Sequence, residues 1–321
     1  MLRRPRMKSR GYLLGVIALG LSAALMAVGC GLGPGAQTGQ ITLMVTSDFG
    51  DGPIGKASAE TGTESETAMR QLQRARTVKT RYGGRFVQSI DGLAAFSSSG
   101  HPFDWFFFVN GIESTVGAAD VTLHAGDDIW WDHRDWSAAT HVPAVVGAWP
   151  HPFTGGTDGK RLPTRLLCAP NAGNQCNKVE AALAAAGIVS ARGLPGIAGK
   201  GSGLRVLVGT WDEIRTDPAA AILLGGPSDS GVYVQPSLRG SGFDLLNPSG
   251  ERGATYGAGT GLVAATVVGD ALPTWLVTGT DNKGLSLAVE ALNLKVLARH
   301  FAVLLTAGGR VVPAPISPEQ R

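Results

Sequence analysis

The stretch that decides the fold runs from Trp105 to Trp136. It reads Trp105-Phe106-Phe107-Phe108-Val109-Asn110-Gly111-Ile112-Glu113 and later continues as Gly126-Asp127-Asp128-Ile129-Trp130-Trp131-Asp132-His133-Arg134-Asp135-Trp136. An Asn-Gly pair between an aromatic run and a β-branched residue predicts a hairpin, because both central positions of a type I′ turn need positive φ. Two strands are therefore expected to meet at Asn110-Gly111.

Upstream of the hairpin, the sequence predicts a strand, a helix and a second strand. Ile41 to Thr46 has the alternation that is typical of a strand. Thr63 and Glu66 stand at capping-box spacing before an apolar series at helical spacing, so a helix is expected to end near Arg76. Arg85 to Ile90 is predicted as the next strand. Together these elements predict an antiparallel sheet with one helix packed across it.

The motifs of this region resemble the transcobalamin-like C-terminal domain family, also catalogued as DUF4430. The resemblance rests on the Trp105 to Gly111 run, on Gly117-Ala118-Ala119, on Gly126 to Asp132 and on Tyr82 to Gly92, and it covers roughly Ile41 to Trp136. Membership of this family implies a small β-grasp-like domain. In the animal cobalamin carriers such a domain covers one face of the corrinoid, so the resemblance implies a cobalamin-like ligand.

The N-terminus predicts export and lipid anchoring. A basic leader precedes an uncharged run from Tyr12 to Val28, and Ala27-Val28-Gly29-Cys30 resembles the bacterial lipobox. Residues 1–29 are therefore expected to be a signal peptide, and Cys30 the acylated N-terminus that enters the lipid bilayer. An uncleaved membrane-spanning signal is the alternative, but the apolar run is shorter than the ~20 residues that a span needs. Both interpretations put the chain on the extracytoplasmic side of the cell membrane.

Charge and cysteine content fit that compartment. Without the five basic residues of the leader, 23 Lys and Arg face 25 Asp and Glu, so the formal charge is −2 and electrostatics give no support for nucleic-acid binding. With Cys30 assigned to lipid, Cys168 and Cys176 remain as a pair close in sequence. In an oxidising compartment such a pair predicts one disulfide, whereas a zinc site would need two further ligands.

The chain is long enough for two domains. Residues 30–40 are predicted as a flexible tether, residues 41–150 as the β-grasp-like domain, and residues 313–321 as a disordered tail. Pro and Gly crowd together at Trp149 to Gly159, where we place the domain boundary. Residues 160–312 alternate strand and helix patterns, which predicts an α/β layered domain of unknown function. The expected fold class is α+β.

Individual elements of the second domain can also be predicted. Helices are expected over Asn177 to Ala186, from Asp217-Pro218 to Leu224, and over Gly284 to Arg299; strands are expected over Leu204 to Val208, Leu262 to Val268, Trp275 to Val277, and Phe301 to Leu305. The Gly279 to Gly284 loop imitates the start of a P-loop. Leu285-Ser286 stands where Lys-Ser/Thr is required, so nucleotide hydrolysis is not expected.

Strand parity divides the aromatic residues into two sets. On a strand from Ile129 to Arg134, Trp131 and His133 point one way while Trp130 and Asp132 point the other, and only one face can lie under the helix. The other face should lie open or at an interface between domains. An exposed aromatic face suits a flat ligand. The residues predicted to bind this ligand are Tyr82, Trp105, Phe107, Trp130, Trp131, His133 and Trp136.

The sequence lacks recognisable catalytic and metal-binding motifs. Asp132 and His133 point to opposite faces of a strand and cannot easily share an ion, so charge-paired surface residues flanking Arg134 are the preferred interpretation. No Gly-x-Ser-x-Gly elbow occurs. We therefore expect no enzymatic activity, no bound metal and no cofactor apart from a cobalamin-like ligand.

Two functions of different classes follow from these patterns. The first is a lipid-anchored extracytoplasmic binding protein that captures a corrinoid-like or other flat small ligand on the aromatic sheet face, for delivery to a membrane transporter. The second is a structural or interaction lipoprotein of the cell envelope, in which the aromatic face is an interface between domains or with a protein partner. The residues alone weigh the two about equally, and the family resemblance favours the first.

Overall fold

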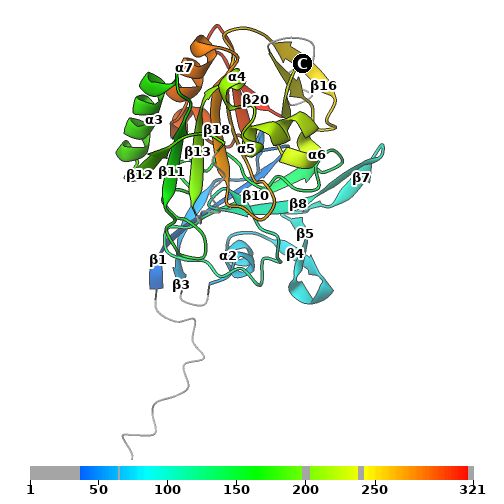
Figure 1. Cartoon of the computed structure of the whole chain (residues 1–321). Helices are drawn as coiled ribbons and strands as arrows, with labels where there is room; N and C mark the ends of the chain where they lie inside the picture. Colours follow the sequence, from blue (N-terminus) through cyan, green and yellow to red (C-terminus); the bar gives the residue numbers. More distant parts are fainter. Residues whose placement is uncertain (1–36, 64–65, 197–202, 238–241, 317–321) are drawn as a thin grey trace, which may run out of the picture. The chain divides into compact units, whose positions relative to one another are not determined.

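Two seven-stranded sheets organise the residues that the structure describes, 37–63, 66–196, 203–237 and 242–316 (Figure 1). The structure is a computed structural model, and its fold class is α+β, as the sequence predicts. The predicted signal peptide, Cys30 and residues 31–36 of the predicted tether lie outside the described residues. Within the described ranges, no helix is long and apolar enough to cross a membrane.

The first sheet, called the N-terminal sheet, has the order β2-β1-β10-β8-β7, with β3 paired to β1 and β9 to β8. Its strands are β1 Gln37–Ser47, β2 Gly52–Pro53, β3 Ser58–Thr63, β7 Phe96–Ser98, β8 His101–Val109, β9 Ile112–Glu113 and β10 Asp128–Asp135. β1 begins inside the stretch predicted as a tether, and it runs parallel to β10, which is antiparallel to β8. The predicted hairpin is confirmed, because β8 and β9 meet at Asn110-Gly111 and both turn residues have positive φ.

One helix, α2 (Ala68–Ala75), packs across the N-terminal sheet. Its cap is Thr67, which accepts from the backbone N–H of Arg70, so the predicted cap at Thr63 is wrong. Glu66 is buried and pairs with Arg74 of the last helical turn instead of reaching back to a capping residue. A three-stranded sheet follows, made of β4 Val78–Arg81, β5 Phe86–Ile90 and β6 Leu93–Ala94, with the 3-10 turn η2 Tyr82–Gly84 between β4 and β5.

The second sheet, called the C-terminal sheet, has the order β12-β11-β13-β18-β17-β19-β20. Its strands are β11 Thr164–Cys168, β12 Ser190–Gly193, β13 Leu204–Thr210, β17 Gly261–Thr266, β18 Thr274–Gly279, β19 Ala302–Leu305 and β20 Val311–Ala314. The first four strands of that order are parallel and the others pair antiparallel. β20 contains Pro313, so the chain stays in the sheet beyond the predicted start of the tail. A further small sheet consists of β14 Val234–Pro236, β15 Phe243–Leu246 and β16 Arg252–Tyr256.

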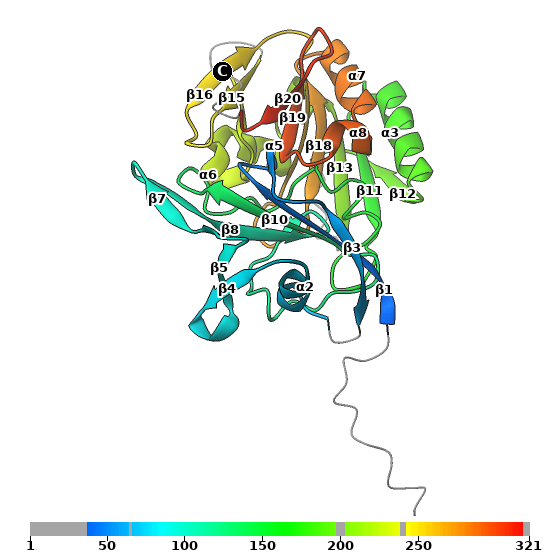
Figure 2. The ribbon, with the colours of Figure 1, turned by 180° about the vertical axis from the view of Figure 1, so that it is seen from behind.

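Helices α3 and α7 lie side by side on one face of the C-terminal sheet (Figures 1 and 2). The helices are α3 Gly173–Ala185, α4 Trp211–Ile214, α5 Pro218–Ala221, η3 Ile222–Gly225, α6 Pro227–Ser230, α7 Asn282–Glu290 and α8 Leu294–Leu297. α3 begins at Gly173, before the predicted start at Asn177, and the Asn177 side chain accepts from Arg192. The helix predicted from Gly284 is broken, since Asn293 caps α8 as a new helix. The predicted disulfide between Cys168 and Cys176 is confirmed.

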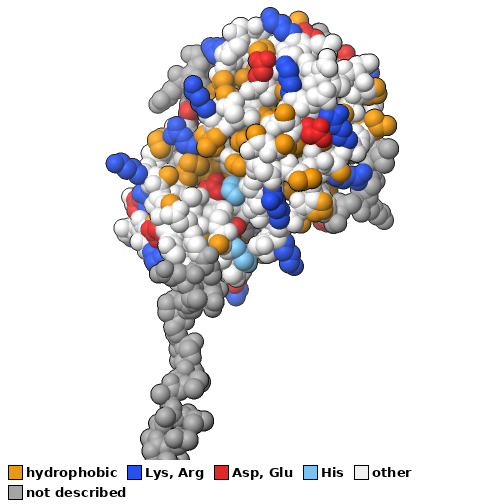
Figure 3. Space-filling model, turned by 90° about the vertical axis from the view of Figure 1, so that its left-hand side faces the viewer, with side chains coloured by type: hydrophobic (Ala, Val, Ile, Leu, Met, Phe, Trp, Pro, Cys, Tyr) orange, Lys and Arg blue, Asp and Glu red, His pale blue; other side chains and the backbone are white. Residues whose placement is uncertain are grey.

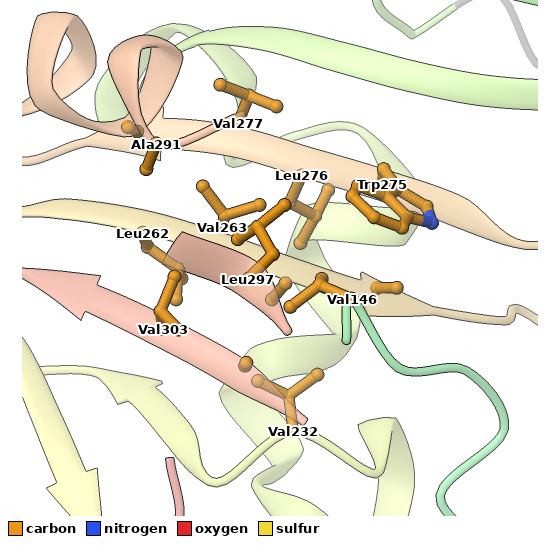
Figure 4. Close-up of a cluster of buried hydrophobic side chains, with 14 of the residues drawn as sticks. Val146, Val232, Leu262, Val263, Trp275, Leu276, Val277, Ala291, Leu297 and Val303 are labelled. Atoms are coloured by element: carbon orange, nitrogen blue, oxygen red, sulfur yellow. The ribbon is translucent and has the colours of Figure 1, made fainter. Parts of the chain in front are cut away.

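The segment at the predicted domain boundary is packed against the C-terminal sheet. Trp149 and Phe153 are buried, and their ring centroids lie 5.5 and 5.3 Å from that of Trp275 in β18. Figure 4 shows Val146 among side chains of the C-terminal sheet such as Val263. Residues from Gln37 on form one compact unit, and the division of this unit into two domains stays a prediction.

Candidate functional site

Strand β10 divides the predicted aromatic site between two faces, and both faces are covered. Trp131 lies on the face under α2, where its ring centroid is 4.6 Å from that of Phe107. Trp130 lies on the opposite face and packs on Phe301, which follows α8, with ring centroids 5.2 Å apart. The face that is expected to lie open or at an interface is therefore an interface within the chain.

Most of the residues predicted to bind a flat ligand are buried. Five of them expose 7% or less of their surface: Trp105, Phe107, Trp130, Trp131 and His133. Tyr82 is 80% exposed at the turn between β4 and β5, and Trp136 is partly exposed just beyond β10. Trp105, Phe107 and Trp131 line a pocket of about 190 Å³ beside Phe86, which is smaller than the roughly 300–1,000 Å³ that is usual for small-molecule sites. Among the described residues, the predicted side chains do not form one open aromatic plane that would fit a corrinoid-like ring.

A buried carboxylate, Asp132, organises the Trp130 face. It is fully buried and accepts hydrogen bonds from Thr46 Oγ1 at 2.5 Å, Phe49 N at 3.1 Å and Gly50 N at 3.0 Å. Thr46 Oγ1 accepts in turn from Trp130 Nε1 at 2.7 Å. Burial raises the pKa of Asp132 to about 6, and the bond from Thr46 acts against that shift. Asp132 therefore holds the turn between β1 and β2.

Arg134 forms a buried ion pair on the same face as Asp132. Its guanidinium donates to Glu113 Oε1 at 2.8 Å and lies 3.8 Å from the ring centroid of Phe106. Glu113 also accepts from Val142 N at 2.7 Å, and burial raises the pKa of this carboxyl. The prediction that surface residues flank Arg134 is wrong, because distant parts of the chain cover this face and bury the whole Asp132 to Asp135 stretch.

His133 is enclosed by aromatic rings. Its ring centroid lies 5.6 Å from Phe96, 5.9 Å from Phe103 and 5.0 Å from Trp105. Its Nε2 is 3.2 Å from the carbonyl oxygen of Ala94, and burial lowers the pKa of the imidazole. A neutral ring that donates to a backbone carbonyl holds β6 against β10 and has no free nitrogen for a ligand on that side.

A pocket of about 490 Å³ lies where the N-terminal sheet meets the end of α8, and we call it the junction pocket. Its volume falls within the roughly 300–1,000 Å³ that is usual for small-molecule sites. Much of its wall is apolar and includes Met44, Trp149, Pro150, Leu294 and Ala298, with Arg299 beside them. Figure 3 shows a face of the molecule on which hydrophobic side chains gather around an acidic and a histidine side chain.

Two titratable groups converge on the junction pocket. Asp128 Oδ1 accepts from Thr42 Oγ1 at 2.5 Å, and burial raises the pKa of this carboxyl while the bond from Thr42 opposes the shift. Burial lowers the pKa of His151, and the charge of Asp128 acts against that shift. Neighbouring groups whose pKa values are shifted in a pocket are typical of functional sites.

The hairpin turn positions the carboxylates of the junction pocket. Asn110 Nδ2 donates to Asp127 Oδ1 at 2.8 Å, and Asp128 N donates to Asn110 Oδ1 at 2.9 Å. Asp127 also accepts from His124 N at 2.7 Å. The Asn-Gly pair that predicts the hairpin therefore also fixes the backbone at the start of β10, where Asp128 enters the pocket.

The sequence did not reveal the junction pocket, because its residues come from distant segments. Thr42, Asp128, His151 and Leu294 lie on four separate parts of the chain. The available signals were the Asp127-Asp128 pair before β10 and a histidine between two prolines, both of which read locally as turn residues. Within the described ranges, no group of three or more His, Cys, Asp or Glu side chains could hold a metal ion.

Comparison with known families identifies one part of the chain. Residues 62–134 match DUF4430, a domain of unknown function. The match confirms the resemblance seen in the sequence over those residues. The matched stretch runs from the end of β3 to β10, so it includes Asp128 and the aromatic hairpin but not His151 or α8.

Two solved structures resemble parts of this chain. One, from Ruminococcus gnavus ATCC 29149, is described as a "putative metal binding protein", with 14% identity and a TM-score of 0.23 over 30% of this chain and 97% of that chain. The other is haptocorrin in complex with Cbi, with 14% identity and a TM-score of 0.24 over 31% of this chain and 26% of that chain. The likeness thus covers about a quarter of haptocorrin. A search of curated proteins gave no match.

Proposed function

We propose that this protein is an extracytoplasmic binding protein, held at the membrane by an acylated Cys30, that takes a small and partly apolar ligand in the junction pocket. The observation that carries this proposal is the pocket itself. It has the volume of a small-molecule site, much of its wall is apolar, and Asp128 and His151 meet in it. Delivery of the ligand to a membrane transporter is part of the same proposal.

The chemistry of the pocket limits the ligand. Trp149 and Met44 offer apolar surface, whereas Asp128 offers a carboxylate that keeps an acceptor site beyond its bond to Thr42. The pocket therefore suits a ligand that donates a hydrogen bond to Asp128 and packs an apolar group on Trp149. The pocket suits a compound of drug size. The buried aromatic rings give no support for a corrinoid-like ligand, so cobalamin is included in the titration as a test.

A fluorescence titration of the acylated protein tests ligand binding, because Trp149 lies in the pocket wall. The titrants are cobalamin and a series of small apolar amines, alcohols and acids. We expect saturable quenching by members of the small series. The variant Asp128→Asn keeps an oxygen for Thr42 but lowers affinity for a donor ligand by roughly tenfold.

A matched pair of tryptophan substitutions locates the site. Ala298→Trp fills the junction pocket and is expected to abolish binding, whereas Val189→Trp adds the same ring at a position that is 90% exposed outside the pocket. Equal binding by both variants would exclude the junction pocket. Labelling with palmitate tests the anchor separately, since Cys30→Ser should lose the label.

A structural role in the cell envelope is the second candidate, and one observation favours it. The aromatic face of Trp130 is already occupied by Phe301, as expected of an interface rather than of an open ligand platform. This role predicts a macromolecular partner whose capture from envelope extract is unchanged by Ala298→Trp. Loss of the partner in that variant would instead link it to the junction pocket.

A further inference from the structure

We propose that the tip of the β4–β5 hairpin docks on an anionic phospholipid surface and so fixes the face that the anchored protein turns to its membrane. The tip consists of Lys79, Arg81, Tyr82 and Phe86 around the η2 turn. The inference rests on the proposed acylation of Cys30 for the position of the bilayer. It goes beyond the proposed function because it assigns a lipid-binding surface away from the junction pocket.

Two aromatic rings are exposed to solvent at the tip. Tyr82 is 80% exposed and Phe86 is 37% exposed, and their ring centroids lie 6.2 Å apart at an interplanar angle of 72°. Tyr82 has a φ of 52°, and Gly83 and Gly84 follow with φ values of 69° and 90°. A left-handed backbone at a bulky residue is strained. The fold therefore holds the Tyr82 ring outward on a strained, left-handed turn.

Cationic side chains surround these rings. Lys79 and Arg81 alternate with half-buried residues of β4, so both point to the exposed side of the strand. Neither forms an ion pair with another described residue. Arg85 makes one long contact, 3.9 Å from Asp120. Unpaired cations beside exposed aromatic rings complement a surface of phosphate headgroups over an apolar interior.

The short connection between Cys30 and β1 indicates that the bilayer lies next to the tip. Only residues 31–36 separate Cys30 from Gln37, the first residue of β1. Even fully extended, this connection reaches about 25 Å. Figures 1 and 2 draw the start of β1 and the tip of the β4–β5 hairpin at the same end of the described unit. An acyl chain on Cys30 therefore brings this end, and the tip with it, to the bilayer.

The test uses the acylated full-length protein on vesicles. An environment-sensitive fluorophore is attached through Gly83→Cys, where an added Cβ meets no heavy atom within 4 Å, although the φ of 69° adds backbone strain. Cys168 and Cys176 are disulfide-bonded and do not react. The control carries the same fluorophore through Val189→Cys, which is 90% exposed in the C-terminal half. Thermal unfolding of each labelled protein checks that the fold is kept.

On vesicles of phosphatidylcholine with phosphatidylglycerol, the fluorophore at position 83 should brighten and shift to the blue, while that at position 189 should not. Lys79→Gln and Arg81→Gln should each lower the equilibrium constant for docking of the tip by about fivefold. Tyr82→Ser with Phe86→Ser should remove the blue shift. Vesicles of phosphatidylcholine alone should give a weaker response than the anionic vesicles.

Three results would overturn the inference, and they differ from one another. Protein that does not float with vesicles at all contradicts the acyl anchor and removes the basis of the orientation. Protein that floats but shows equal emission at positions 83 and 189 keeps the anchor and contradicts docking of the tip. A blue shift that appears only after envelope proteins are added assigns the tip to a protein partner.

Discussion

The two faces of strand β10 are both aromatic and both buried, yet they are held together by different interactions. The Trp131 face packs on α2 through apolar side chains, and Trp131 Nε1 has no hydrogen-bond partner among the described residues. The Trp130 face carries Asp132 and Arg134, and each of them bonds to partners from other segments of the chain. The Trp131 face is covered by α2, which is near in sequence, and is held by hydrophobic packing. The Trp130 face is covered by segments distant in sequence, and buried charged groups add hydrogen bonds that fix its geometry.

The largest expected effect removes the buried ion pair of the Trp130 face. Arg134→Met removes the guanidinium from the buried Glu113 carboxylate and leaves it only Val142 N and the exposed His141, 3.5 Å away. The free energy of unfolding should therefore fall by about 3–5 kcal/mol. Urea denaturation at neutral pH measures this loss. The matched control is Arg192→Met, whose partner Glu180 and own side chain are both about two-fifths exposed. Loss of that surface pair should lower the free energy of unfolding by less than about 1 kcal/mol. Equal losses in the two variants would show that the buried pair is no more important for stability than the surface pair.

A smaller effect concerns the pH dependence of the same face. Burial raises the pKa of Asp132 to about 6 in the folded protein. The carboxyl has a pKa near 3.9 in the unfolded chain. Between about pH 4 and about pH 6 the folded state therefore binds more protons than the unfolded state. The free energy of unfolding should fall as pH rises through this range, by up to roughly 3 kcal/mol. Denaturation across this range measures the slope.

The substitution Asp132→Asn should flatten that slope, although it also weakens the bonds from Phe49 and Gly50 at every pH. The slope is therefore the diagnostic quantity and the overall stability is not. Asp212→Asn, at an exposed carboxyl in α4, serves as the control and should leave the slope unchanged. An identical slope in wild type and Asp132→Asn would assign the pH dependence to other groups.

The smallest expected effect compares the two indoles directly. Trp130→Phe removes the donor that bonds Thr46 Oγ1 at 2.7 Å, whereas Trp131→Phe removes a donor with no partner in the described part of the chain. Both substitutions lose similar apolar area. Trp130→Phe should therefore be more destabilising by about 1 kcal/mol, as measured by thermal unfolding of the two variants. A larger loss for Trp131→Phe would contradict the assignment of the hydrogen bond.

Local features of the fold could be predicted from the sequence because they depend on neighbouring residues. The Asn110-Gly111 turn needs positive φ, and the alternation of β10 sets Trp130 and Trp131 on opposite faces. The short spacing of Cys168 and Cys176 predicted their disulfide. The parallel pairing of β1 with β10 could not be predicted, since no local pattern specifies which distant strand becomes a neighbour.

The site was harder to predict than the fold, because burial depends on what covers a side chain. Tyr82 belongs to an exposed turn, whereas the indole of Trp130 is covered by Phe301. Nothing near Trp130 in sequence indicates that cover. His151 enters the junction pocket only because its segment folds back beside β1 and β10. The residue types therefore suggested a site on the aromatic face, whereas in the folded chain these residues are mostly buried and the candidate site is the junction pocket.

The contact between Trp130 and Phe301 sets an order for maturation. Under the proposed export route, the chain crosses the membrane N-terminus first, so residues 37–135 emerge long before the segment that supplies Phe301. During that interval the α2 side of the sheet can close, while the opposite side presents an uncovered indole to the envelope. Until the last strands arrive, this uncovered aromatic side is the part of the partly folded chain most prone to aggregation.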